Sequence, residues 1–86
     1  MKSTKETIRT FVVDNFLFGD NESLTDDVSF LDEGIIDSTG VLELVTFLEE
    51  TFSISVNDDE LTPENLDSLN KITAFVDNKK REQAAA

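Results

Sequence analysis

The residue types that could support chemistry in this 86-residue chain gather in one short run, Asp37-Ser38-Thr39-Gly40. A serine hydroxyl is a weak nucleophile unless a general base lies beside it. The chain has no histidine and no cysteine, and its lysines and arginines lie only near its two ends. We therefore expect Ser38 to be modified by another enzyme rather than to react by itself.

Ser38 stands where a loop gives way to an amphipathic helix, which the apolar spacing predicts from about Ser38 to Phe52. Serine and aspartate both favour the N-cap, so either Ser38 or Asp37 could simply cap this helix. The alternative is a covalent anionic group on Ser38, which would meet unpaired N–H groups and a favourable dipole at the helix N-terminus. The local pattern leaves both interpretations open.

The elements that would position this run are all predicted to be helices. A capping box over Ser3-Thr4-Lys5-Glu6 opens the first helix, and Gly19-Asp20-Asn21 ends it. A long connection over residues 18–36 follows. We expect four apolar side chains to anchor it on the core, because a loop of this length needs such contacts: Leu24, Val28, Phe30 and Leu31.

Two further helices are predicted after residue 60. Thr62-Pro63-Glu64 has the pattern of a helix start and predicts a short third helix that ends near Asp67. Ser68 would cap a fourth helix, with Lys79-Lys80-Arg81 suited to the negative end of its dipole. The inward-facing side chains of this helix would be Leu69, Ile72, Phe75 and Val76.

The predicted fold class is therefore all-α: a small four-helix bundle of three main helices and one short helix, with a long first loop. We expect a single domain over residues 1–83 and a disordered tail over residues 84–86. The phenylalanines are expected in the core, and some of them could also line a cavity: Phe11, Phe16, Phe30, Phe52 and Phe75.

The charge of the chain is unevenly distributed as well as strongly negative, with a formal net charge of −12. Residues 10–70 contain no lysine or arginine, and every acidic residue except Glu6, Asp77 and Glu82 lies in that span. Such a surface repels nucleic acid and attracts partners that carry basic patches. Simple solubility is the alternative explanation of this charge.

Composition also excludes several classes of protein and site. No stretch approaches the ~18 apolar residues of a membrane span, and the N-terminus lacks an apolar signal core, so we expect a cytoplasmic protein. Without cysteine or histidine the usual zinc sites are excluded. Asp20-Asn21-Glu22 and Asp26-Asp27 lack the ligand spacing of a calcium loop, so no metal site is predicted.

Asp37-Ser38, preceded by Gly34-Ile35-Ile36 and followed by Val41-Leu42-Glu43-Leu44-Val45, resembles the attachment site of the acyl carrier protein family. Members of this family are small four-helix domains that carry 4′-phosphopantetheine on a serine. The resemblance extends over nearly the whole chain, through segments that match the end of the long loop and the later helices: Phe30-Leu31-Asp32-Glu33, Leu48-Glu49-Glu50-Thr51-Phe52, Leu61-Thr62-Pro63-Glu64-Asn65-Leu66 and Leu69-Asn70-Lys71-Ile72.

The resemblance implies a carrier protein that is not itself an enzyme. Ser38 would carry the phosphopantetheine arm, with Asp37 and Thr39 beside it in the cofactor-binding site, and the thiol of the arm would hold an acyl group as a thioester. A monomer is expected, serving lipid, polyketide or related biosynthesis, including fatty acid biosynthesis.

The resemblance also implies protein partners. These are a phosphopantetheinyl transferase, a ligase that loads an acyl or aminoacyl group, and downstream synthases or transferases. Their basic docking patches would contact one set of residues at and after the attachment site: Asp37, Glu43, Thr46, Phe47, Glu49 and Glu50.

Three positions near the attachment site depart from the usual family pattern. Thr39 replaces the common leucine or methionine, Gly40 stands where fatty-acid carriers are often acidic, and Thr46 replaces an apolar contact residue. These departures favour a specialised carrier, and a small residue like Gly40 also occurs in carriers of amino acids such as D-alanyl carrier proteins. An unmodified acidic helical module that binds a basic partner is the remaining alternative.

Overall fold

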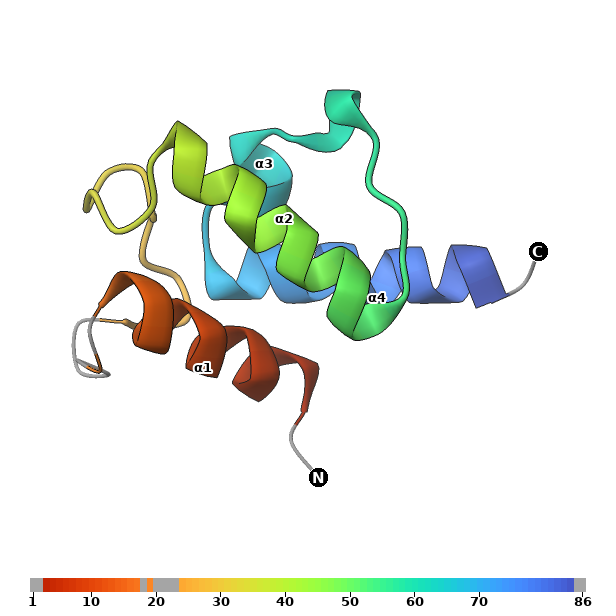
Figure 1. The fold of residues 1–86 in the computed structure, drawn as a ribbon, viewed down its shortest axis with the longest axis horizontal. Helices are drawn as coiled ribbons and strands as arrows, with labels where there is room; N and C mark the ends of the chain where they lie inside the picture. Colours follow the sequence, from red (N-terminus) through yellow and green to blue (C-terminus); the bar gives the residue numbers. More distant parts are fainter. Residues whose placement is uncertain (1–2, 18, 20–23, 85–86) are drawn as a thin grey trace.

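The computed structural model describes residues 3–17, 19 and 24–84, and the side chains of Ser38 and Ala84 lie outside that description. All regular elements in the described ranges are helices (Figure 1). They are α1 (Thr4–Phe16), α2 (Ser38–Phe52), a 3₁₀ turn η1 (Asp58–Glu60), α3 (Pro63–Leu66) and α4 (Leu69–Ala84). The predicted all-α fold, with three long helices and one short helix, is confirmed.

The two ends of α1 are set by a side-chain cap and a glycine. The Ser3 hydroxyl accepts a hydrogen bond from the Glu6 N–H at 3.1 Å, which confirms the predicted start. At the other end, the N–H groups of Leu17 and Gly19 both donate to the Val13 carbonyl, at 3.3 and 2.9 Å. Gly19 has φ +88°, a left-handed conformation that favours glycine. The predicted terminators Asp20 and Asn21 lie outside the described residues.

The bounds of α2 and α3 agree with the sequence pattern. α2 begins at Ser38 and ends at Phe52, followed by Ser53 in the left-handed conformation with φ 55°. α3 has Pro63 at its first turn and ends at Leu66, one residue before the predicted end. Ser68 accepts a hydrogen bond from the Lys71 N–H at 3.1 Å and so caps α4 as predicted.

Side chains from all four helices and from the first loop form the core, and α4 packs mainly against α1 and α3 (Figure 1). All four predicted inward-facing residues of α4 are buried. α4 continues to Ala84, one residue beyond the expected end of the domain, and the rest of the expected tail lies outside the described residues. Among the phenylalanines, Phe30 and Phe75 are buried, whereas Phe11, Phe16 and Phe52 are only partly buried.

The long first loop is anchored by fewer residues than expected. Leu24 and Phe30 are buried and Val28 is half-buried, but Leu31 is 49% exposed, so its predicted anchoring role is wrong. The cause is a tight turn after Phe30, whose carbonyl accepts the N–H of Ile35 at 2.8 Å. This turn carries Leu31 outward and brings Ile36 into the core, where it is 1% exposed.

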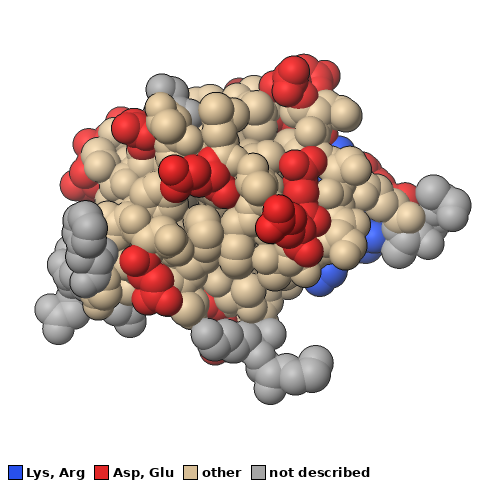
Figure 2. Space-filling view, viewed as in Figure 1, with Lys and Arg blue, Asp and Glu red and all other residues tan. Residues whose placement is uncertain are grey.

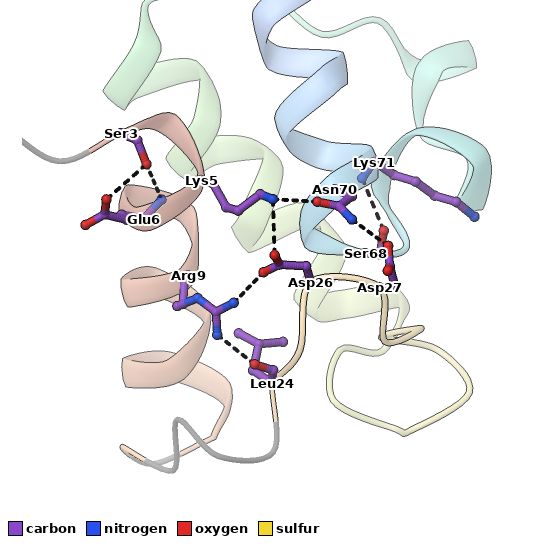
Figure 3. A network of polar contacts seen from close by, with 10 residues as sticks. All are labelled: Ser3, Lys5, Glu6, Arg9, Leu24, Asp26, Asp27, Ser68, Asn70 and Lys71. Atoms are coloured by element: carbon purple, nitrogen blue, oxygen red, sulfur yellow. Dashed lines mark hydrogen bonds and ion pairs between the residues drawn. The ribbon is translucent and has the colours of Figure 1, made fainter.

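A polar network fixes the same loop to α1 and α4 (Figure 3). Asp26 accepts from Lys5 at 3.3 Å and from Arg9 at 2.5 Å, and Lys5 also donates to Asn70 at 2.6 Å. The hydrogen bond from Lys5, helped by its charge and by Arg9, outweighs burial and holds the pKa of Asp26 below its ordinary value. Asp27 accepts from the Asn70 amide. Both carboxylates therefore hold the loop in place.

A second ion pair holds the connection between α2 and α3. Lys79 of α4 is only 7% exposed, and its ammonium lies 2.6 Å from the Glu60 carboxylate of η1. The sequence pattern assigned Lys79 only to the helix dipole and did not predict this pair. The hydrogen bond from Lys79, followed by that from the Asn57 N–H, lowers the pKa of Glu60.

No helix in the described part of the chain is both long enough and apolar enough to cross a membrane.

We predict that Glu60→Gln lowers the free energy of unfolding by about 1–2 kcal/mol, because it leaves a nearly buried ammonium without its carboxylate. Glu64→Gln is the matched control, since Glu64 is exposed on the adjacent α3, and it should change stability by less than about 0.5 kcal/mol. Urea unfolding of both variants measures the difference. Equal values for the two would show that the Lys79–Glu60 pair contributes nothing.

Candidate functional site

The first turn of α2 is built on Asp37. This residue is in an extended conformation, and its Oδ1 accepts a hydrogen bond from the Gly40 N–H at 2.7 Å. Its carbonyl accepts the Val41 N–H at 3.0 Å, which is the first helical hydrogen bond. Asp37 is therefore the N-cap, and Ser38 is the first residue of the helix. This resolves the two capping assignments that the sequence left open.

The loop before α2 delivers the chain to this point from a buried anchor. Gly34 has φ +66°, which allows the tight turn after Leu31, and its N–H donates to the Leu31 carbonyl at 3.2 Å. Ile36 is buried immediately before the exposed Asp37. The chain thus passes from the core to the surface within one residue, and Ser38 comes next, at the start of the helix.

The N-terminal end of α2 has one electrostatic feature that favours a bound anion and one that opposes it. The first N–H groups of a helix have no intrahelical partner, and the aligned dipoles of the 15-residue α2 favour an anion there. Asp37 occupies one of these N–H groups, that of Gly40. Its own charge opposes a second anion, but the residue is exposed and this repulsion is screened by solvent.

An apolar pocket of about 260 Å³ opens between the first loop, α2 and α3. Val41 and Leu42 contribute to it from the turn of α2 that comes after Ser38. Leu31 and Leu42, which are 49% and 58% exposed, belong to its lining. The full set of lining residues is Phe30, Leu31, Ile36, Val41, Leu42, Leu61, Thr62, Pro63, Leu66 and Asp67.

These surroundings fit the 4′-phosphopantetheine group that the resemblance implies. The one charged side chain that lines the pocket, Asp67, is engaged by the Leu31 N–H at 3.0 Å and by the Ser29 hydroxyl. The remaining lining is almost entirely apolar, so it suits the hydrocarbon parts of an arm or of its cargo. Of the five phenylalanines considered as cavity residues, Phe30 lines this pocket and the other four do not.

The residues predicted to contact partners differ in how accessible they are. Asp37, Glu43, Thr46 and Glu50 are exposed, as is Thr39 beside the attachment site. Glu49 is half-buried, and its Oε2 accepts the Val56 N–H at 3.0 Å. Phe47 is also half-buried, with its ring stacked on Phe11 at a centroid distance of 4.0 Å. Of the six predicted contact residues, a partner could therefore reach most easily the four exposed ones, Asp37, Glu43, Thr46 and Glu50.

The charge on this face is almost entirely negative. Figure 2 shows acidic side chains spread over the face that includes α2, with lysine and arginine visible only at one edge. This arrangement matches the absence of lysine and arginine from residues 10–70.

The pocket residues of α3 and of the segment before it were missed by the sequence pattern. Leu61, Pro63 and Leu66 contribute to the lining, but four helical residues are too few for a periodic pattern. A signal was present in α2, because Leu42 lies off the buried stripe of this helix and is apolar. The sequence pattern did predict Ile35 and Ile36 as apolar anchors before Asp37, and the burial of Ile36 confirms this for that residue.

Three comparisons with known proteins agree with this geometry. Residues 7–76 match the family model described as the phosphopantetheine attachment site. D-alanyl carrier protein 1 of Lactiplantibacillus plantarum is 36% identical over 78 residues, which cover 91% of this chain and 95% of that protein. The acyl carrier protein of Buchnera aphidicola is 33% identical over 79 residues, covering 92% and 95%.

A solved structure shows the same fold. The solution NMR structure of a holo acyl carrier protein from Nitrosomonas europaea superposes with a TM-score of 0.74 at 30% sequence identity, covering 91% of this chain and 96% of that one. The match of the family model over most of the chain, together with these relatives, shows that the chain belongs to the phosphopantetheine attachment site family of carrier proteins, which bear a phosphopantetheine group and are not themselves enzymes.

Proposed function

We propose that this carrier bears its phosphopantetheine arm on the Ser38 oxygen and holds acyl groups for partner enzymes of lipid, polyketide or related biosynthesis in the cytoplasm. The observation that carries the proposal is the position of residue 38, the first residue of α2, next to the turn that supplies Val41 and Leu42 to an apolar pocket. When bound, the arm supplies a terminal thiol that holds the cargo as a thioester.

In the attachment step, coenzyme A is the donor of the phosphopantetheine group. The Ser38 oxygen forms a bond to phosphorus, the pyrophosphate bond of coenzyme A breaks, and the nucleotide part leaves with the bonding electrons. The hydroxyl proton goes to a base of the transferase, because this chain has no histidine and its basic residues lie near its ends. Ser38 is the acceptor, and the transferase supplies the catalysis.

Residues of this chain would hold the attached phosphate and shelter the rest of the arm. Asp37 starts the helix at the residue before Ser38, which leaves backbone N–H groups of the first turn available to an anion. The exposed Leu42 and Leu31 would contact the hydrocarbon part of the arm or cargo at the pocket. Such contacts exclude water from the thioester without requiring a catalytic group.

The pocket favours an acyl chain over an amino acid as the cargo. Each methylene placed against apolar side chains is stabilised by about 0.8 kcal/mol, so a chain of several methylenes gains several-fold more than the single methyl of alanine. The ammonium of an aminoacyl group would need a partner, and the carboxylate of Asp67 is already engaged by Leu31 and Ser29. These terms support acyl cargo.

An aminoacyl cargo is the second candidate, and two observations favour it. Several relatives are named D-alanyl carrier proteins, including the one that is 36% identical over 91% of this chain. By the resemblance, a small residue at the position of Gly40 also occurs in carriers of amino acids. A short aminoacyl group would leave the apolar pocket unused.

The attachment residue can be tested by intact mass. Incubation of the chain with a phosphopantetheinyl transferase and coenzyme A should add one phosphopantetheine group to the wild type and none to Ser38→Ala, because the acceptor oxygen is missing. Ser55→Ala is the matched control, since Ser55 is an exposed serine away from the site, and it should gain the group normally. An undiminished gain in Ser38→Ala would contradict the proposal.

The docking surface can be tested by charge reversal at exposed positions. Glu43→Lys/Glu50→Lys should weaken association with the transferase by about tenfold at low salt and flatten its salt dependence, because two accessible charges change sign. Asp59→Lys/Glu64→Lys, at two exposed positions outside α2, changes the net charge by the same amount and should have a smaller effect. Surface plasmon resonance at several salt concentrations measures both. Glu49 is left unchanged because its carboxylate holds the Val56 N–H.

The cargo can be tested with two loaded forms of the carrier. We expect an octanoyl thioester to hydrolyse several-fold more slowly on this protein than on free phosphopantetheine, because the chain enters the pocket and excludes water. An alanyl thioester should show no such protection. If neither thioester is protected from hydrolysis, the pocket no longer supports acyl cargo. If a D-alanine ligase loads the protein efficiently and acyl-loading enzymes do not, the second candidate is favoured.

A further inference from the structure

Gly40 is covered by the end of α1, and this contact leaves no room for a side chain. A Cβ atom built on Gly40 would lie 2.8 Å from Phe16 Cε1, 3.0 Å from Ile36 Cγ2 and 3.3 Å from Asp37 Oδ1. Gly40 lies within α2 in an ordinary helical conformation, where alanine would be preferred on propensity alone. The glycine is therefore required for space and not for its backbone freedom.

The ring of Phe16 belongs to an aromatic seam between α1 and α2. Phe16 meets Phe11 edge-on, with a centroid distance of 5.9 Å and an interplanar angle of 69°. Phe11 stacks on Phe47 of α2 at 4.0 Å and 17°. Gly40 and Phe47 are about two turns apart, so they share one face of α2. α1 thus contacts α2 at its first turn through Phe16 and farther along through Phe11.

Two contacts along one face fix the rotation of a helix about its own axis as well as its position. The contact at Gly40 is the one that lies within the turn containing residue 38. Ile36 and Asp37, which directly precede this turn, supply the other two of the three atoms nearest to the Gly40 position. A group inserted there would therefore press on the capping residue and on the buried anchor.

We propose that Gly40 and Phe16 are positioning residues: the Phe16 ring, seated on the backbone at Gly40, sets the orientation in which the first turn of α2 presents Ser38 to the modifying transferase. The inference rests on the proposed attachment at Ser38. It assigns to α1 a part in modification, although α1 supplies no residue to the pocket or to the exposed acidic surface of α2.

The test uses the full chain and the kinetics of phosphopantetheine transfer, followed by intact mass at several carrier concentrations. Gly40→Ala should lower kcat/KM by about tenfold, because displaced acceptor geometry is costly in group transfer. In the double variant Gly40→Ala/Phe16→Leu the smaller side chain relieves the contact, and kcat/KM should return to within about twofold of Phe16→Leu alone. All rates are measured well below the lowest unfolding midpoint, so that loss of fold does not contribute.

Phe11→Leu is the matched control for relief of the contact. It removes an aromatic ring from the same seam by the same chemical change, but Phe11 is not among the atoms nearest to the Gly40 position. Gly40→Ala/Phe11→Leu should therefore remain as slow as Gly40→Ala, or slower. Recovery with Phe11→Leu equal to that with Phe16→Leu would overturn the proposal, and so would an unchanged kcat/KM for Gly40→Ala.

The outcomes separate this inference from the function on which it rests. If the wild type gains no phosphopantetheine, or Ser38→Ala still gains it, the attachment at Ser38 fails and the positioning role fails with it. If modification depends on Ser38 while Gly40→Ala reacts like the wild type, only the positioning role fails.

Discussion

The interaction on which the rest of the site depends is the hydrogen bond from the Gly40 N–H to the Asp37 carboxylate, at 2.7 Å. It fixes where α2 begins, and so it makes Ser38 the first helical residue instead of the cap. Had Ser38 been the cap, its own hydroxyl would have been the acceptor for the helix N–H groups. With Asp37 in that position, capping does not require the serine side chain.

Much of this arrangement could be predicted from the residue pattern, because each element carries a local signal. Ser3, Ser68 and Pro63 mark helix starts through capping and a fixed φ, and the stripe over α2 gives both of its ends. The capping at Asp37-Ser38 was narrowed by the same local signals to two residues, and the attachment role of Ser38 stays a prediction that the family resemblance implies. These signals depend on residues close together in the chain, and local propensity is enough to read them.

The features that were missed depend on contacts between distant segments. The ion pair of Lys79 and Glu60 joins two elements that lie far apart in the sequence, so no local pattern predicts it. Leu31 is exposed because the turn after Phe30 points its side chain away from the core. In the sequence, Glu49 has the same pattern as the exposed acidic residues of α2. In the structure, the segment after α2 folds back, and the Val56 N–H donates to the Glu49 carboxylate. The roles of these residues depend on tertiary contacts, and hydrophobic periodicity in the sequence does not predict such contacts.

The separation of charges along the molecule has a consequence for encounters in solution. The first turn of α2 and the C-terminal part of α4, which bears Lys80 and Arg81, lie at opposite ends of the fold (Figure 1). Asp77 and Glu82 offset part of the positive charge there, but this end is still less acidic than the rest of the chain, and the difference gives the molecule an electric dipole. The field of a positively charged protein exerts a torque on this dipole, which turns the C-terminal end of α4 away and the α2 end toward that protein. The molecule would thus be partly oriented before the two surfaces touch, which shortens the rotational search for a productive collision.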